Sequence, residues 1–139
     1  MQRPSSFVMD SYALIGFLEN ESFADRVERL LNRAKRGKCV LYLHAIHLGE
    51  VYYITMRERG QDLANLVYNR IKAFPVKLIE VIDEDLLLTA SFLKASYPIS
   101  YADSFAAAMA KIKKSTLLTG DPEFECLQKE GILEISWLS

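Results

Sequence analysis

The feature that most constrains the fold is a regular alternation of short apolar runs with longer segments of helical periodicity. The apolar runs occupy residues 7–9, 39–43, 76–82, 116–118 and 132–138, and each is short enough to be a buried strand. The helical segments occupy residues 12–18, 23–34, 44–59, 63–74, 86–95 and 100–113. In the second of these, apolar residues recur on one face of a 3.6-residue repeat, and Gly37 closes the helix.

Strand and helix therefore alternate along the chain. This order predicts an α/β fold with an open, mostly parallel central sheet and helices on both faces. An edge position is considered for the last strand, 132–138. In such sheets a ligand binds in the crevice beyond the carboxyl ends of the strands, so residues that directly follow a strand are the first candidates for a functional site.

Composition bounds the remaining possibilities. The chain has 139 residues, half of them hydrophobic and a quarter charged, which fits a single domain over residues 1–139. A formal net charge of -1 excludes a strongly basic chain, so nucleic acid would have to bind through local patches. The cysteines are far apart and Cys39 falls in an apolar run, so a reducing, cytoplasmic location is expected. Residues 1–6 lack a leader pattern, and no run approaches the roughly 18 apolar residues of a membrane span.

Four carboxylates stand where a sheet of this kind would place a site. Asp10 ends the first strand and Asp121 follows the fourth, so both would point into the same crevice. Asp103 lies in the first turn of an alanine-rich helix, whose small side chains allow another element to approach closely. Glu50 shares the face of its helix that should pack on the sheet. All four side chains could therefore converge.

Each acid taken singly has a structural explanation. The two acids that follow strands could be helix N-caps, with Pro122 in a typical first helical position after the second of them. Asp103 could close a capping box with Ser100. Glu50 could be a partly exposed helix residue that pairs with Arg57 or with another basic residue nearby.

The four acids are harder to explain as a set. Carboxylates gathered in one crevice repel one another, and each close pair costs on the order of 4 kcal/mol at about 4 Å and an effective dielectric near 20. Hard divalent cations such as Mg²⁺ or Mn²⁺ prefer oxygen ligands and would relieve this repulsion. Such a cation activates a water and offsets charge on a phosphate under attack. The sequence therefore indicates hydrolysis of a phosphodiester.

Four segments of the chain resemble the PIN-domain nucleases, and most closely the VapC-type toxins of bacterial and archaeal toxin-antitoxin pairs. The segments are residues 8–11 (VMDS), 47–51 (HLGEV), 99–105 (ISYADSF) and 117–124 (LLTGDPEF). Their order and spacing are specific together, and the match spans nearly the whole chain. The resemblance implies a PIN-like three-layer fold.

The resemblance also implies a site and an activity. The implied catalytic and metal-binding residues are Asp10, Glu50, Asp103 and Asp121, which would bind one or two Mg²⁺ or Mn²⁺ ions. Ser11 or Thr119 would hold a water bound to the metal. The implied activity is that of an endoribonuclease that cuts structured RNA, commonly a transfer RNA or a ribosomal RNA loop. The implied partners are a cognate antitoxin bound across the groove and a second copy of the chain in a homodimer, with no membrane involved.

Several other residues receive structural interpretations. His44 and His47 lack a third close ligand, so we interpret them as packing or surface residues rather than zinc ligands. Basic residues within 33–38 and 111–114 are typical of solvated helix ends. Glu123 could supply an additional oxygen and ranks below the four acids.

Three alternative functions stay open. A phospho-accepting receiver also uses acids at strand ends, but it requires adjacent acids after the first strand, where Asp10 is followed by Ser11 and Tyr12. A haloacid-dehalogenase-like phosphatase requires an Asp two residues after Asp10, where Tyr12 stands. The third alternative is a PIN fold that binds RNA or a protein partner without cleaving RNA, and the retention of all four acids speaks against it.

Overall fold

In the computed structural model, which describes residues 5–138, the strands form one five-stranded sheet in the order β3-β2-β1-β4-β5. The strands are β1 (Ser5–Met9), β2 (Cys39–His44), β3 (Lys77–Ile79), β4 (Thr116–Thr119) and β5 (Ile135–Trp137). Every neighbouring pair is parallel. The predicted parallel α/β sheet is confirmed, and β5 lies at an edge.

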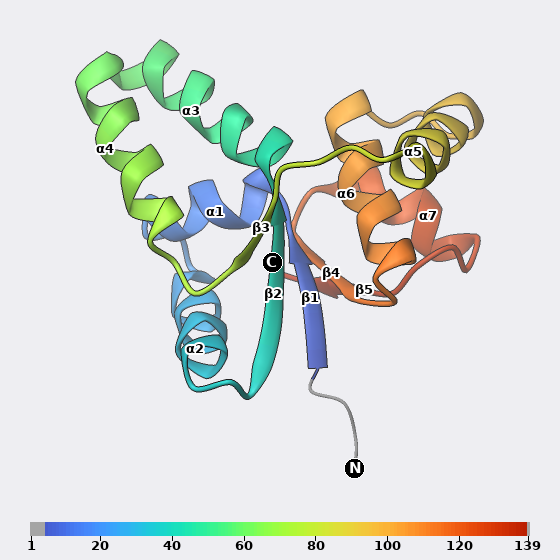
Figure 1. The fold of residues 1–139 in the computed structure, drawn as a ribbon, viewed down its shortest axis with the longest axis horizontal. Coiled ribbons are helices and arrows are strands. Elements are labelled where there is room, and N and C mark those ends of the chain that lie inside the picture. The colour runs from blue at the N-terminus through green and yellow to red at the C-terminus, as the bar shows by residue number, and fades with distance from the viewer. Residues whose placement is uncertain (1–4, 139) are drawn as a thin grey trace.

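Helices cover both faces of the sheet (Figure 1). One face carries α1 (Ser11–Leu18), α2 (Ala24–Lys35), α3 (Ala45–Arg59) and α4 (Gln61–Lys72). The other face carries α5 (Glu84–Ser96), α6 (Tyr101–Ile112) and α7 (Glu125–Lys129). The predicted helices are present with small shifts at their ends. The short helix α7 was not predicted, whereas the 3₁₀ turn before it, η1 (Pro122–Phe124), begins at Pro122, as the cap considered for Asp121 requires.

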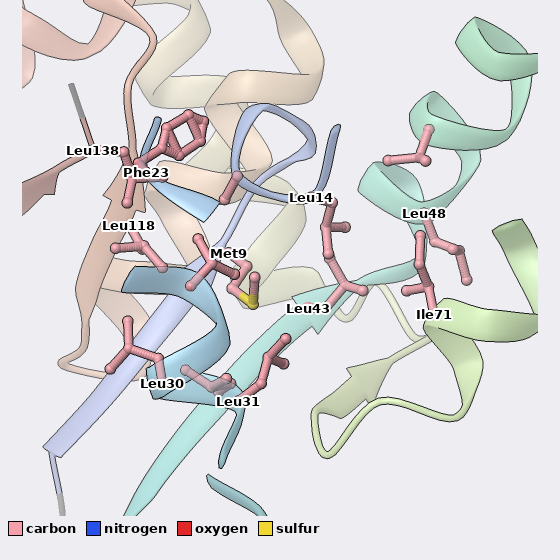
Figure 2. Packing of buried hydrophobic residues seen from close by; sticks show 14 of the residues in the cluster. Met9, Leu14, Phe23, Leu30, Leu31, Leu43, Leu48, Ile71, Leu118 and Leu138 are labelled. Atoms are coloured by element: carbon pink, nitrogen blue, oxygen red, sulfur yellow. The ribbon is translucent and has the colours of Figure 1, made fainter. Parts of the chain in front are cut away.

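The alternation of side chains along each strand divides the hydrophobic residues between two cores. Met9 and Leu118 point to the face with α1 to α4, where they pack among leucines of α2 and β2 (Figure 2). Val8 and Leu117 point to the opposite face, and all four side chains are fully buried. Because β1 and β4 contribute to both cores, residues just beyond their carboxyl ends are held by both helical layers.

Helix α6 packs closely on the sheet because it presents small side chains. Residues 103–110 are all buried, and four of them are alanines. The helix contacts β1 and β4 on one side and α5 on the other. Since α6 leads into β4 and runs against its direction, its amino end, with Asp103, lies near the carboxyl ends of β1 and β4.

Two strands are shorter than predicted because their partners limit them. The run 76–82 forms a strand only over Lys77–Ile79, which pairs with the end of β2 at one edge of the sheet. Val81 is 70% exposed, and its carbonyl oxygen lies 3.2 Å from Nε2 of His44 as the chain crosses to α5. The run 132–138 is a strand only over Ile135–Trp137, the residues that β4 can pair.

Three smaller expectations concern the amino terminus, membrane spans and cysteines. The absence of a leader was expected over residues 1–6, of which 1–4 lie outside the described residues. Between residues 5 and 138, no helix is long and apolar enough to cross a membrane. Cys39 and Cys126 are free thiols, and Cys39 is buried as its apolar run predicted.

Two glycines give a matched test of the helix packing. A Cβ added at Gly16 in α1 would lie 2.0 Å from Cζ of Phe23, whereas Gly49 in α3 has open space around it. We expect Gly16→Ala to lower the free energy of unfolding by about 1 to 3 kcal/mol, because Phe23 must move. We expect Gly49→Ala to raise it by about 0.5 to 1 kcal/mol, because alanine is the better helix former. Urea denaturation measures both, and a stabilised Gly16→Ala would contradict this packing of Phe23.

Candidate active site

The candidate site lies where the strand order of the sheet reverses. From β1 the chain continues to β2 and β3 on one side, and β4 and β5 lie on the other side. The helices that follow β1 and β4 therefore diverge, which leaves a crevice beyond the carboxyl ends of these two strands. Asp10 directly follows β1 and Asp121 comes shortly after β4, so the structure brings both to this crevice, as their positions predicted.

Asp10 is almost completely buried and accepts two hydrogen bonds. Its Oδ1 accepts from the backbone N–H of Ala13 at 3.0 Å, which makes Asp10 the N-cap of α1. Its Oδ2 accepts from the hydroxyl of Thr119 at 2.5 Å, and Thr119 Oγ1 accepts from the N–H of Asp121 at 3.0 Å. Asp10 is therefore a cap, as considered, and the same side chain is fixed toward Asp121.

Asp103 does not close a capping box with Ser100. Oγ of Ser100 accepts from the N–H of Asp103 at 3.1 Å and caps α6, but the N–H of Ser100 donates to the carboxylate of Glu123. The acid of this capping arrangement thus comes from η1, and the capping role considered for Asp103 is wrong. The Asp103 carboxylate takes no part in the cap and interacts instead with Glu123 and Asp121.

Three carboxylates meet at this point. One oxygen each of Asp103, Asp121 and Glu123 lies within 4.8 Å of the other two. Asp121 is held there because its Oδ1 caps η1, accepting from the N–H of Glu123 at 2.9 Å, with Pro122 in the first position of the turn. The N-cap considered for Asp121 is confirmed, and it orients an acid of the cluster.

Glu50 reaches the same region from α3. Glu50 is half-buried, and burial raises the pKa of its carboxyl. A hydrogen bond from the Ser11 side chain lowers this pKa, and the charge of Asp121 raises it. Its Oε1 is buried and has no hydrogen-bond partner among the described residues. The pairing with Arg57 that was considered is not seen among the described residues: the charge of Arg57 does not act on the pKa of Glu50, and the Arg57 guanidinium lies over the ring of Tyr53, 5.3 Å from its centre.

Burial and nearby negative charges also raise the pKa values of Asp10 and Asp103. Burial raises the pKa of Asp10 to about 7, against the hydrogen bonds that it accepts. Burial raises the pKa of Asp103, and the hydrogen bond that it shares with Glu123 and the nearby charges of Asp121, Glu123 and Asp10 raise it further. The charge of Asp121 contributes to the raised pKa of Asp10, Glu50 and Asp103 alike, so Asp121 couples the acids.

These residues fit a hard divalent cation. The donors are carboxylate oxygens, which Mg²⁺ and Mn²⁺ prefer. Glu50 Oε1 is a buried acceptor without a donor, and a cation would satisfy it. The raised pKa values of Asp10 and Asp103 reflect charges that lack a counter-charge, which a cation would supply.

The model of the PIN domain family matches residues 7–130 of the chain. The chain belongs to the PIN domain family. PIN domains are typically metal-dependent nucleases, and this one carries the acidic triad described above. No curated protein is significantly similar to the chain in sequence.

Solved structures similar to this PIN domain are VapC toxins of VapBC toxin-antitoxin complexes, and the likeness covers most of the chain. VapBC2 from Rickettsia felis, bound to a DNA fragment from its promoter, gives a TM-score of 0.75 at 12% identity over 96% of this chain and 99% of that one. VapBC-1 from nontypeable Haemophilus influenzae gives a TM-score of 0.70 at 19% identity, over 96% of this chain and 98% of that one. Mycobacterium tuberculosis VapC20, a Sarcin-Ricin loop cleaving toxin, gives a TM-score of 0.64 at 18% identity, over 88% of this chain and 94% of that one. At these identities the likeness establishes the shared fold.

The two hydroxyls considered as water holders have different surroundings in this PIN domain. Thr119 is fully buried, and its hydroxyl donates to Asp10 and accepts from Asp121. It serves to join the two strand-end aspartates. Ser11 is partly exposed, and its side chain forms a hydrogen bond with the carboxyl of Glu50.

Glu123 and His47 make contacts at the site that the sequence analysis did not predict. Glu123 belongs to the acidic cluster because the turn of η1 places it beside Asp121 and against Ser100. Its signal was the acid two residues after a strand-end aspartate, across a proline. His44 and His47 are both buried, in agreement with packing roles, but His47 also bonds to the backbone next to Asp103.

The repulsion between the acids can be measured with Asp121→Asn. The variant loses the charge that raises three pKa values, while Asn keeps the oxygen that accepts from the N–H of Glu123. Because the pKa of Asp10 is raised from 3.8 to about 7, its contribution to stability is present at low pH and is lost as pH rises through about 7. In buffer with a chelator, we expect the wild type to lose thermal stability between about pH 6.5 and 8.

Asp121→Asn should lose less stability than the wild type over this range. At about pH 8 its melting temperature should exceed that of the wild type by about 2 to 4 °C for each kcal/mol of repulsion removed. The range starts above the region where His47 acts in the opposite direction, since burial lowers its pKa to about 4. Asp62→Asn, on the exposed first turn of α4, is the control. Identical pH dependence in wild type and Asp121→Asn would mean that the acids do not repel one another.

Proposed function

We propose that the chain is a divalent-metal-dependent endoribonuclease, a single PIN domain over residues 1–139 that acts in the cytoplasm as the toxin of a type II toxin-antitoxin system. The observation that carries this proposal is the convergence of four separate chain segments on one crevice, each supplying a carboxylate and together lacking a counter-charge. Membership in the PIN domain family supports it. The neighbouring VapC structures support the toxin assignment.

In this proposal Asp10, Glu50, Asp103 and Asp121 hold one or two Mg²⁺ or Mn²⁺ ions and carry the catalysis. A bound cation supplies Lewis acidity, which activates water and stabilises charge on the phosphate. The protein holds its ligands rigidly: Thr119 and the start of α1 fix Asp10, and the cap of η1 fixes Asp121. Ser11 orients the attacking water from the side of Glu50.

The proposed substrate is structured RNA, a transfer RNA or a ribosomal RNA loop. The cleavage of the Sarcin-Ricin loop named for VapC20 supports this class of substrate. The alternative is a PIN-fold module that binds RNA or protein without cleaving RNA. The uncompensated acids favour the nuclease, because a binding surface for a polyanion gains nothing from buried negative charge.

Replacement of one acid tests the nuclease assignment. We expect Asp103→Asn to reduce Mg²⁺-dependent or Mn²⁺-dependent cleavage of cellular RNA by more than about 100-fold, because a ligand charge is lost. Asp62→Asn, on the exposed surface of α4, should cleave like the wild type. Millimolar Mn²⁺ should raise the melting temperature of the wild type, and raise it less in Asp103→Asn. Undiminished cleavage by folded Asp103→Asn would reject the assignment.

The proposed antitoxin site is a groove of about 610 Å³ between α1, α3 and α4. Its apolar lining is provided by Ile15, Leu18, Ile54, Leu63, Leu66 and Val67. Leu66 is 65% exposed, and charged residues of both signs, Glu58, Arg59 and Arg70, also line the groove. An amphipathic antitoxin helix would cover the leucines and pair with these charges. The VapBC complexes among the structural neighbours support an antitoxin partner.

The proposed homodimer forms through the outer face of α5. Leu88 and Phe92 are 59% and 62% exposed there, in a depression also lined by Asp85 and Lys111. A two-fold axis through such a patch would bring the apolar residues together and set Asp85 of one copy near Lys111 of the other.

Two charge substitutions separate these partners. With the antitoxin encoded by an adjacent reading frame, we expect Leu66→Glu to weaken binding at least about tenfold by calorimetry and to stay dimeric in light scattering. Phe92→Glu should be monomeric and should still bind the antitoxin. Both residues are exposed, so neither change should unfold the protein. If Leu66→Glu disrupted the dimer and Phe92→Glu weakened antitoxin binding, the two surfaces would have been assigned the wrong way round. If neither substitution had an effect, both assignments would be rejected.

A further inference from the structure

His47 is a fully buried histidine in the first turn of α3. Its Nε2 lies 2.9 Å from the carbonyl oxygen of Ala102. Because a carbonyl oxygen can only accept, Nε2 carries the ring proton and Nδ1 carries the lone pair. That Nδ1 is buried and has no hydrogen-bond partner within residues 5–138.

A buried acceptor without a partner destabilises a protein, so a hydrophobic side chain of similar size would be more stable at this position. The neighbouring His44 has no such defect. Its Nδ1 accepts from the N–H of Ile46 at 3.0 Å and caps α3, and its Nε2 lies near the Val81 carbonyl. His44 is thus explained by local structure alone, whereas His47 contributes one polar contact and leaves its other nitrogen unsatisfied.

The contact that His47 makes joins the two helices that carry acids of the site. Glu50 lies one turn beyond His47 on α3, and Asp103 directly follows Ala102 on α6. The two helices belong to opposite faces of the sheet (Figure 1). Burial first, and the charge of Asp121 in addition, raise the pKa values of both Glu50 and Asp103, so both helices bring their acids close to Asp121. The His47 bond is a direct contact that ties the two helices together there.

We propose that His47 is a positioning residue of the metal site: its Nε2–H bond to the Ala102 carbonyl sets the spacing of α3 and α6 at which Glu50 and Asp103 can share a divalent cation. This inference rests on the metal site of the proposed function. A small divalent cation requires near-ideal ligand geometry, and groups that orient its ligands have a large effect on its affinity. The cost of the unsatisfied Nδ1 is then the consequence of a functional constraint.

Three variants test the proposal through Mn²⁺ binding, measured by calorimetry on the RNA-free protein, and through melting in a chelator. His47→Leu keeps the volume and removes both the donor and the unsatisfied acceptor. It should melt at or above the wild-type temperature, yet bind Mn²⁺ about 10- to 100-fold more weakly. His47→Gln places an N–H donor at similar reach and should restore the affinity to within about threefold of wild type. His44→Asn keeps the cap of α3. It should melt at a lower temperature than the wild type but bind Mn²⁺ with the same affinity.

The outcomes separate this proposal from the proposed function. A wild type that binds no Mn²⁺ overturns both. A wild type that binds Mn²⁺, with Asp103→Asn impaired and His47→Leu unchanged in affinity, overturns the role of His47 alone. Weaker Mn²⁺ binding in His44→Asn as well as in His47→Leu, or failure of His47→Gln to restore binding, assigns the effect to general loosening of the packing and also overturns it.

Discussion

The electrostatic repulsion between buried carboxylates at the carboxyl edge of the sheet is the constraint on which this structure depends. Asp121 contributes to the raised pKa of Asp10, Glu50 and Asp103, and Glu123 joins them from the same turn. An isolated domain gains no stability from this arrangement, since the charged forms are both desolvated and close together. The fold must therefore hold the acids in place by other contacts, and their chemistry accounts for why they are gathered.

Backbone capping supplies most of that restraint. Asp10 caps α1, Asp121 caps η1, and Glu123 bonds to the N–H of Ser100 at the start of α6. Each of these bonds is ordinary local structure, yet each also fixes the direction of an acid of the site. The structural and functional explanations of these residues are thus compatible, because the two oxygens of a carboxylate together offer about four lone pairs and a cap uses only one of them.

The two helical layers meet the site from opposite sides. Glu50 comes from the layer of α1 to α4, and Asp103 from the layer of α5 to α7. Small side chains along α6 let this helix lie close to β1 and β4, and the His47 bond ties its first turn to α3. The surfaces proposed for the two partners involve α1, α3 and α4 of the first layer and α5 and α6 of the second.

The amino-acid pattern was sufficient to predict the parallel α/β sheet, because strands and helices alternate along the chain. It also predicted that Asp10 and Asp121 lie together, because residues that follow parallel strands meet at one edge of the sheet. Helical periodicity also placed Glu50 on the face of its helix that packs on the sheet and Asp103 in the first turn of an alanine-rich helix, and the resemblance to PIN-domain nucleases implied their metal-binding roles. The tertiary structure alone decided that Glu123 rather than Asp103 completes the cap at Ser100, and that Glu50 is free of Arg57. These outcomes depend on helix rotation and on distances between elements, which a periodic pattern defines only to a sector of the helix.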